Sequence, residues 1–201
     1  MSKLTAAVTD TTGAIRTKRL VLRPWRDSDR EAFAALNADP AVREHFPGLM
    51  TREDSDGFVD RIEAHWDTDG WGLWAVEVRE HGQFIGFVGL SEPSFEAHFT
   101  PCTEIGWRLA RSSWGRGYAT EAARACLDFA FRSLGLPEVV AFTVPANARS
   151  RAVMERLGMR HDAAGDFDHP RLPAGHPLQR HVLYRLRRED WQPGSTVLAQ
   201  P

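Results

Sequence analysis

The segment from Glu104 to Leu134 limits the possible folds of this chain more than any other stretch. From Glu104 to Ala110 large apolar residues occupy every second position, which predicts a strand with one buried face. A turn that contains two glycines follows. Beyond it apolar residues recur at steps of three and four up to Leu134, which predicts an amphipathic helix packed on a sheet.

The turn before this helix has the properties of an anion site. The first four N–H groups of a helix have no partners within it, and they carry the positive end of the helix dipole. Gly115 and Gly117 allow the backbone to turn sharply and let a phosphate approach several N–H groups. Arg111 and Arg116 flank the turn and supply further donors. Because short glycine patterns are weak signals, a turn whose glycines serve geometry alone is the alternative.

Four sequence motifs together resemble one known superfamily. The motifs are Glu104-Ile105-Gly106-Trp107, Trp114-Gly115-Arg116-Gly117-Tyr118-Ala119-Thr120-Glu121-Ala122, Asn147-Ala148-Arg149-Ser150 and Glu155-Arg156-Leu157-Gly158-Met159. They resemble the GNAT superfamily of acetyl-CoA-dependent N-acetyltransferases. Within it, the chain is similar to the RimJ/RimL-type branch, whose founding members acetylate the N-termini of ribosomal proteins. The similarity covers most of the chain, from Thr17 to Trp191.

The resemblance implies a binding mode for coenzyme A. In the family, two central strands splay apart, here Glu104 to Ala110 and Val139 to Val144, and the pantetheine arm lies between them. Trp114 departs from the Gln or Arg of the general family pattern, but it leaves the backbone donors unchanged. The cofactor-binding residues that the resemblance implies are Leu109, Arg111, Trp114, Gly115, Arg116, Gly117, Tyr118, Ala119, Thr120 and Asn147.

The resemblance also implies two catalytic residues. A lysine-like amine is neutral in only about one molecule in 10³ to 10⁴ at pH 7, so a general base assists its attack. Glu104 matches the usual base position, and a structural carboxylate paired with an arginine is the alternative. Many members protonate the departing thiolate with a tyrosine, but Met154 occupies that position. The resemblance to the RimJ/RimL-type branch implies that Ser150, one turn earlier, lies near the sulfur, with a cap at Asn147 and a surface serine as the alternative.

The fold expected from these patterns and the resemblance is α/β (α+β), with a GNAT-like mixed, twisted, mostly antiparallel sheet of about seven strands and helices on both faces. Residues 1–15 are predicted as a tail, 16–191 as a single acetyl-CoA-binding domain, and 192–201 as a second tail. Capping signals at Ser28 and Thr51 predict two helices after the first strand. The predicted strands are Thr17 to Arg23, Leu73 to Arg79, Phe84 to Leu90, Glu104 to Ala110, Val139 to Val144, Met159 to Asp162 and Gln179 to Leu186.

The composition of the chain argues against several classes of binding partner. The formal net charge of −2 gives no overall attraction to nucleic acid or to an anionic membrane. No apolar run is long enough to span a bilayer, and no secretory signal is recognised, so a cytoplasmic protein with free thiols at Cys102 and Cys126 is expected. The histidines between His161 and His181 lack a compact ligand spacing, so no metal site is predicted.

The predicted function is acetyl-CoA-dependent N-acetyl transfer, directly to a primary amine in a ternary complex. The acceptor is a peptide or protein N-terminus or a small-molecule amine. A non-catalytic acyl-CoA-binding or protein-interaction module on the same fold is the alternative. A nucleotide-binding domain of another fold is disfavoured, because no lysine-serine pair follows Gly117. The oligomeric state stays open, with a homodimer among the alternatives.

Overall fold

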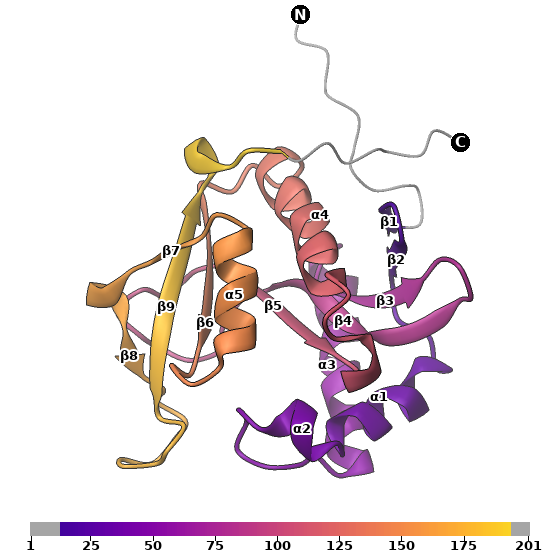
Figure 1. Ribbon diagram of the computed structural model, residues 1–201, viewed down its shortest axis with the longest axis horizontal. Coiled ribbons are helices and arrows are strands. Elements are labelled where there is room, and N and C mark those ends of the chain that lie inside the picture. The colour runs from indigo at the N-terminus through magenta and orange to yellow at the C-terminus, as the bar shows by residue number, and fades with distance from the viewer. Residues whose placement is uncertain (1–12, 194–201) are drawn as a thin grey trace, which may run out of the picture.

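The computed structural model describes residues 13–193, and within them nine strands form one mixed sheet. The strand order is β1-β2-β3-β4-β5-β6-β9-β7, and β8 pairs with β9 (Figure 1). The strands are β1 Ile15–Arg16, β2 Leu20–Arg23, β3 Leu73–Val78, β4 Gln83–Ser91, β5 Glu104–Leu109, β6 Glu138–Thr143, β7 Arg160–His161, β8 Phe167–Asp168 and β9 Arg180–Arg187. The helices are α1 Asp29–Asn37, α2 Pro40–Arg43, α3 Arg52–Asp69, α4 Tyr118–Arg132 and α5 Ala148–Arg156.

This architecture confirms the predicted fold class. The pairing is antiparallel throughout the described sheet except between β5 and β6, which run parallel. The sheet has nine strands where about seven were predicted, because β1 lies before the first predicted strand, which begins at Thr17, and because β8 lies in a segment predicted as a loop. The predicted strand itself starts later, at Leu20, since Thr17 N–H donates to Leu20 O in a turn. The folded part begins before the predicted boundary at residue 16, since Ala14 and Ile15 are buried. Predicted tail residues 1–12 and 194–201 lie outside the described residues.

Helices cover both faces of the sheet. Helices α4 and α5 pack on one face, where the buried side of α4 meets β2 to β6 (Figure 1). Helices α1 and α3 pack on the opposite face, against Ala75 of β3 and Phe87 of β4. Among residues 13–193, no helix has the length and apolar character needed to cross a bilayer.

One predicted helix cap is confirmed and the other is wrong. Thr51 and Asp54 exchange hydrogen bonds in a reciprocal capping box at the start of α3. Ser28 makes no capping hydrogen bond at the start of α1. The neighbouring Asp29 is instead buried and accepts two hydrogen bonds from Arg23, Nη1 to Oδ2 at 2.7 Å and Nη2 to Oδ1 at 2.8 Å. This ion pair joins the end of β2 to the start of α1.

Replacing Asp29 with asparagine is expected to lower the free energy of unfolding by about 2 kcal/mol. The Arg23 guanidinium would stay buried with one carboxylate fewer, while Glu77 would still accept from its Nε at 2.9 Å. Urea unfolding measures the change. Asp27→Asn is the control, because the Asp27 side chain is 98% exposed and its removal should cost at most about 0.5 kcal/mol. Equal losses in the two variants would show that the buried pair is not what stabilises this corner.

Candidate active site

The two parallel strands at the centre of the sheet pair at a single position. Glu104 of β5 lies opposite Val140 of β6, and no further pair follows although both strands continue. Beyond Glu104 the strands diverge, as Figure 1 shows. A cavity of about 1120 Å³ opens there, between the end of β5, the start of α4, the exposed side of α5 and helix α2.

The start of α4 presents backbone donors to this cavity. Gly117 is the N-cap residue, with φ of +76°, and it makes no side-chain capping bond. The first backbone bond of the helix runs from Glu121 N to Gly117 O, so the N–H groups of the three preceding residues have no carbonyl partner within the helix. These residues, Tyr118, Ala119 and Thr120, line the cavity together with Gly115 and Gly117. Their arrangement is suited to a diphosphate.

A contact between distant parts of the chain fixes the start of α4. The Glu121 carboxylate accepts from Thr17 Oγ1 at 2.6 Å, from Arg19 N at 2.8 Å and from Arg19 Nε at 2.6 Å. Burial opposes ionisation, but these hydrogen bonds and the Arg19 charge hold the pKa of Glu121 below its usual value. Arg19 also donates to the carbonyl of Arg116 at 2.9 Å. The Arg19 side chain therefore holds both the turn and the first turn of the helix.

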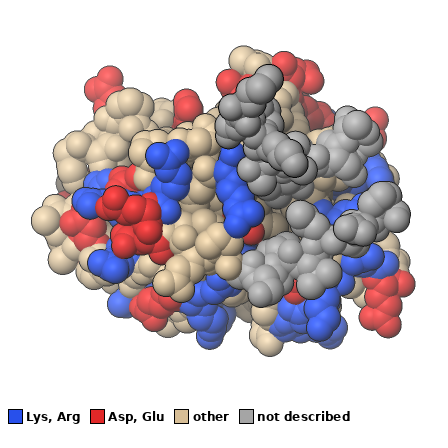
Figure 2. Space-filling model, turned by 90° about the horizontal axis from the view of Figure 1, so that it is seen from above, with Lys and Arg blue, Asp and Glu red and all other residues tan. Residues whose placement is uncertain are grey.

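The two flanking arginines named from the sequence lie away from the cavity. Arg111 and Arg116 are exposed and do not line it. Five other basic residues do line it, and sequence reasoning missed them because they come from four separate segments: Lys18, Arg108, Arg124, Arg149 and Arg156. On the face seen in Figure 2, acidic and basic side chains both occur, so neither sign covers that surface. The formal net charge of the chain is −2, so the basic lining is a local feature of the cavity.

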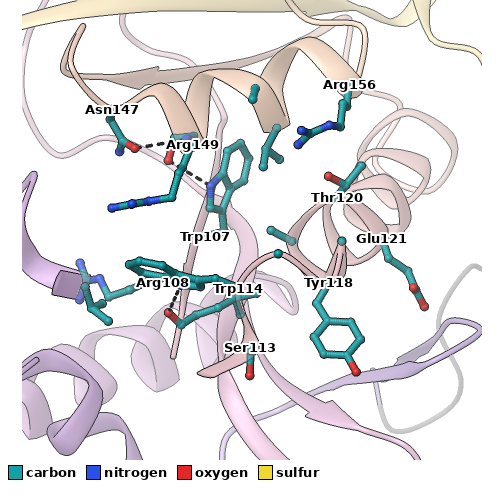
Figure 3. Close-up of a pocket in the computed structure, with 18 of the residues that line it drawn as sticks. Trp107, Arg108, Ser113, Trp114, Tyr118, Thr120, Glu121, Asn147, Arg149 and Arg156 are labelled. Carbon is teal, nitrogen blue, oxygen red and sulfur yellow. Dashed lines mark hydrogen bonds between the residues drawn. The ribbon is translucent and has the colours of Figure 1, made fainter. Parts of the chain in front are cut away.

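Trp114 connects the turn to the central strand. Its indole Nε1 donates to Leu109 O at 2.8 Å, and the Arg149 guanidinium stacks on its ring at 4.4 Å (Figure 3). Ala110 N donates to Ile85 O of β4. Because N–H groups alternate in direction along a strand, the N–H of Leu109 points away from β4 and toward the opening beside β5. The structure thus brings Trp114 and Leu109 to the same wall.

Asn147 and Ser150 also lie at the cavity. Asn147 caps α5, since its Oδ1 accepts from Ser150 N at 3.2 Å, and its Nδ2 donates to Thr143 Oγ1 at 3.0 Å. Ser150 Oγ accepts from the indole Nε1 of Trp107 at 3.3 Å (Figure 3). A hydroxyl oxygen that accepts this proton keeps its own O–H as a donor. Both residues line the cavity, so the cap and the proposed cofactor contact are compatible.

Glu104 lies at the point where β5 and β6 diverge but does not line the cavity itself. Its side chain is half-buried, and desolvation by burial raises its pKa to about 8. Gly106 is the next residue on the same strand face. Glu104 Oε1 lies 4.0 Å from the position that a Cβ on Gly106 would take. The carboxyl group therefore borders a stretch of strand that carries no side chain.

The described residues contain no group of three or more His, Cys, Asp or Glu side chains that could hold a metal ion. Cys102 and Cys126 are both free.

Known proteins resemble this chain over most of its length. The sequence profile of a family described as "Acetyltransferase (GNAT) domain" matches residues 19–160. The FsC-acetyl coenzyme A-N(2)-transacetylase of Aspergillus fumigatus is 35% identical over 191 residues, which cover 88% of this chain and 77% of the relative. The ribosomal protein uS5-alanine N-acetyltransferase of Escherichia coli is 25% identical over 90% of this chain and 93% of its own length. The name of this second relative agrees with the predicted branch.

A solved structure shows the same fold. The crystal structure of an acetyltransferase from Agrobacterium tumefaciens is 32% identical and superposes with a TM-score of 0.71. The match covers 93% of this chain and 99% of that one.

Proposed function

Because the chain belongs to the GNAT acetyltransferase family, we propose that it transfers the acetyl group of acetyl-CoA directly to a primary amine while both substrates are bound. The observation that carries this proposal is the glycine-capped start of α4, whose donors face a cavity that continues to the opening between β5 and β6. A diphosphate on these donors leaves the rest of the cavity for an extended arm. The thioester would then lie near Leu109, Trp107 and Ser150.

The basic lining supports coenzyme A as the ligand. Lys18, Arg124 and Arg156 line the cavity on the side of α4 and α5, where they favour a ligand with several phosphate groups. Arg124 Nη2 donates to Arg156 O at 2.7 Å, which ties the two helices together beside the opening. The single acidic residue in the described lining, Glu121, is neutralised by Arg19.

The residues of β5 and α5 have distinct roles in the proposed reaction. The amine nitrogen attacks the thioester carbonyl carbon, a C–N bond forms, and the C–S bond breaks. Glu104 accepts the proton that the amine loses, directly or through water in the space beside Gly106. The N–H of Leu109 stabilises the negative charge that develops on the carbonyl oxygen. Ser150 donates a proton to the departing thiolate and regains one from solvent, to which Glu104 releases the proton that it took from the amine; a thiolate of pKa about 8.5 needs only modest assistance.

The relatives point to two acceptor classes. The name of the E. coli relative gives the alanine of a ribosomal protein as its acceptor, and the name of the Aspergillus relative gives a nitrogen labelled N(2). A peptide N-terminus and a small-molecule amine are both nitrogen nucleophiles, so both classes are tested as acceptors.

A thiol-release assay tests the proposal. Purified protein with acetyl-CoA is expected to release free coenzyme A only when an amine acceptor is added, and mass spectrometry should show acceptor heavier by one acetyl group. A panel of peptides, amino acids and simple amines covers both classes. Tight binding of acetyl-CoA with no thiol release across the panel would favour the non-catalytic acyl-CoA-binding module instead. Failure to bind acetyl-CoA would refute both functions.

A further inference from the structure

A buried cation on the cavity wall has no acidic partner. Arg108 belongs to β5, lines the cavity and is only 9% exposed. Its Nη1 donates to Asn37 Oδ1 at 2.7 Å and approaches Met50 Sδ at 3.8 Å. Its Nε is buried without a hydrogen-bond partner, and within residues 13–193 no carboxylate pairs with the guanidinium. Burying a charge without a counter-ion is costly, so this arrangement needs an explanation.

Aromatic rings offset part of this cost. The guanidinium carbon of Arg108 lies 4.5 Å from the ring centre of Phe46 and 5.4 Å from those of Phe58 and Phe87. The guanidinium of Arg43 also lies 4.5 Å from the ring centre of Phe46. Two positive charges therefore share one ring. Cation–π contacts attract each of them, but they do not neutralise the pair.

The two acidic residues at the ends of α2 are engaged by other groups. Asp39 caps α2 by accepting from Ala41 N at 2.8 Å, and Glu44 pairs with Arg149 at 2.7 Å. Burial, and after it the charge of Arg43, lower the pKa of Arg108 to about 9. The guanidinium therefore keeps its charge at pH 7, and the cavity keeps a positive group available to a ligand.

Arg108 lies where the acceptor is expected to bind and not where the phosphates of the cofactor are expected. Arg108 follows Trp107, whose indole contacts Ser150 at the expected position of the thioester (Figure 3). Its side chain lies on the same face of β5 as Glu104 and Gly106, because residues two apart on a strand share a face. Leu109, beside the start of α4, faces the other way. An acceptor that approaches along the face of Glu104 would meet Arg108.

We infer that Arg108 binds a carboxylate of the acceptor, so that the substrate is a small amine that also carries a carboxylate, such as an amino acid. This inference rests on the proposed function. A guanidinium donates charge-assisted N–H···O bonds to a carboxylate; Asn37 engages Nη1 and Nε is buried, so Nη2 is the nitrogen that we expect to meet the ligand. A peptide N-terminus lacks this charge next to its amine. The uncompensated cation thus selects against long peptides.

Matched acceptors test the inference. Thiol release is measured with a series of α- and ω-amino acids, with the corresponding carboxamides, and with short peptide amides. The wild-type protein is expected to favour the carboxylate of each pair by at least about tenfold in kcat/KM, mainly through KM. Arg108→Met should remove this preference while the affinity for acetyl-CoA holds, and Arg108→Lys should restore part of it.

A control variant and the opposite results complete the experiment. Arg61→Met removes an exposed arginine that contacts the same Phe58 ring, 5.6 Å away, from outside the cavity, and it should leave the preference unchanged. Carboxamides or peptides turned over as fast as amino acids by the wild-type protein would overturn the inference and leave acetyl transfer intact. This comparison uses only the wild-type protein, so it tests the carboxylate preference even if Arg108→Met does not fold. No turnover of any acceptor by protein that binds acetyl-CoA would instead overturn the proposed function, and this inference with it.

Discussion

Replacing Gly117 with valine is expected to abolish measurable binding of acetyl-CoA, a loss of more than about a hundredfold in affinity. Gly117 has φ of +76°, a conformation that costs a residue with a Cβ about 1–2 kcal/mol and a β-branched residue more. The valine would also bring methyl groups to the surface where the diphosphate meets the start of α4. Arg19 Nη2 lies there, 3.5 Å from the position that a Cβ on residue 117 would take. The backbone strain and the added methyl groups both disturb the N–H donors at the start of α4. Isothermal titration with coenzyme A measures the affinity.

Gly135→Val is the matched control for this experiment. Gly135 follows the other end of α4 with φ of +68°, and no atom lies within 4 Å of the position that its Cβ would take. Similar backbone strain should therefore lower stability without changing the affinity for coenzyme A. If both variants bound as tightly as the wild-type protein, the start of α4 would not be the phosphate site.

Glu104→Gln is expected to lower turnover by about a hundredfold at pH 9, and by progressively less as the pH falls. The pKa of Glu104 is raised to about 8, so its carboxylate form, the form that accepts a proton, is populated mainly above pH 8. The wild-type rate should therefore rise through about pH 8, and the variant should lose that rise. At pH 6 the two proteins should converge, because Glu104 is then protonated in the wild-type protein. The measurement is the pH profile of kcat with one acceptor.

Measuring the free energy of unfolding of Glu104→Gln shows whether its loss of turnover is due to a less stable fold. An acid whose pKa is raised in the folded state makes the protein less stable as the pH rises from the unfolded pKa of that acid, about 4.3, through its folded pKa. A glutamine at position 104 avoids that loss, so the variant should be at least as stable as the wild-type protein at pH 8. Glu92→Gln, in the exposed loop after β4, should keep the wild-type profile. Parallel pH profiles for Glu104→Gln and the wild-type protein would remove Glu104 from the base role.

Local patterns in the sequence were sufficient for most of the fold. Alternation placed β3, β5 and β9 within one or two residues, a turn signal placed β4 and a continuous apolar run placed β6. The capping box at Thr51 marked the start of α3. These patterns involve residues that are close together in the chain, so they can be recognised in the sequence without knowledge of the fold. Ser28 shows the limit of this reasoning, because a buried ion pair between Arg23 and Asp29 overrides the local capping signal.

The candidate site could be predicted only in part. The backbone donors around Gly117 follow from a contiguous motif, and the structure places them on the cavity. The contacts between Arg19 and Glu121 join residues 102 positions apart, and no local pattern indicates them. Arg108 occupies a polar position of an alternating strand, which predicts exposure, yet packing by α1 and the segment after α2 buries it. Burial of a charge depends on what covers the strand, and alternation cannot supply that information.

The single rung between β5 and β6 has a mechanical consequence. The ladder is continuous from β1 to β5 and again from β6 to β9, so backbone bonding divides the sheet into two blocks that meet at Glu104 and Val140. A ligand bound between β5 and β6 contacts both blocks and stabilises their relative position. Heat resistance should then report occupancy, since a ligand at a hundred times its dissociation constant adds about 2.7 kcal/mol to the stability of the bound form.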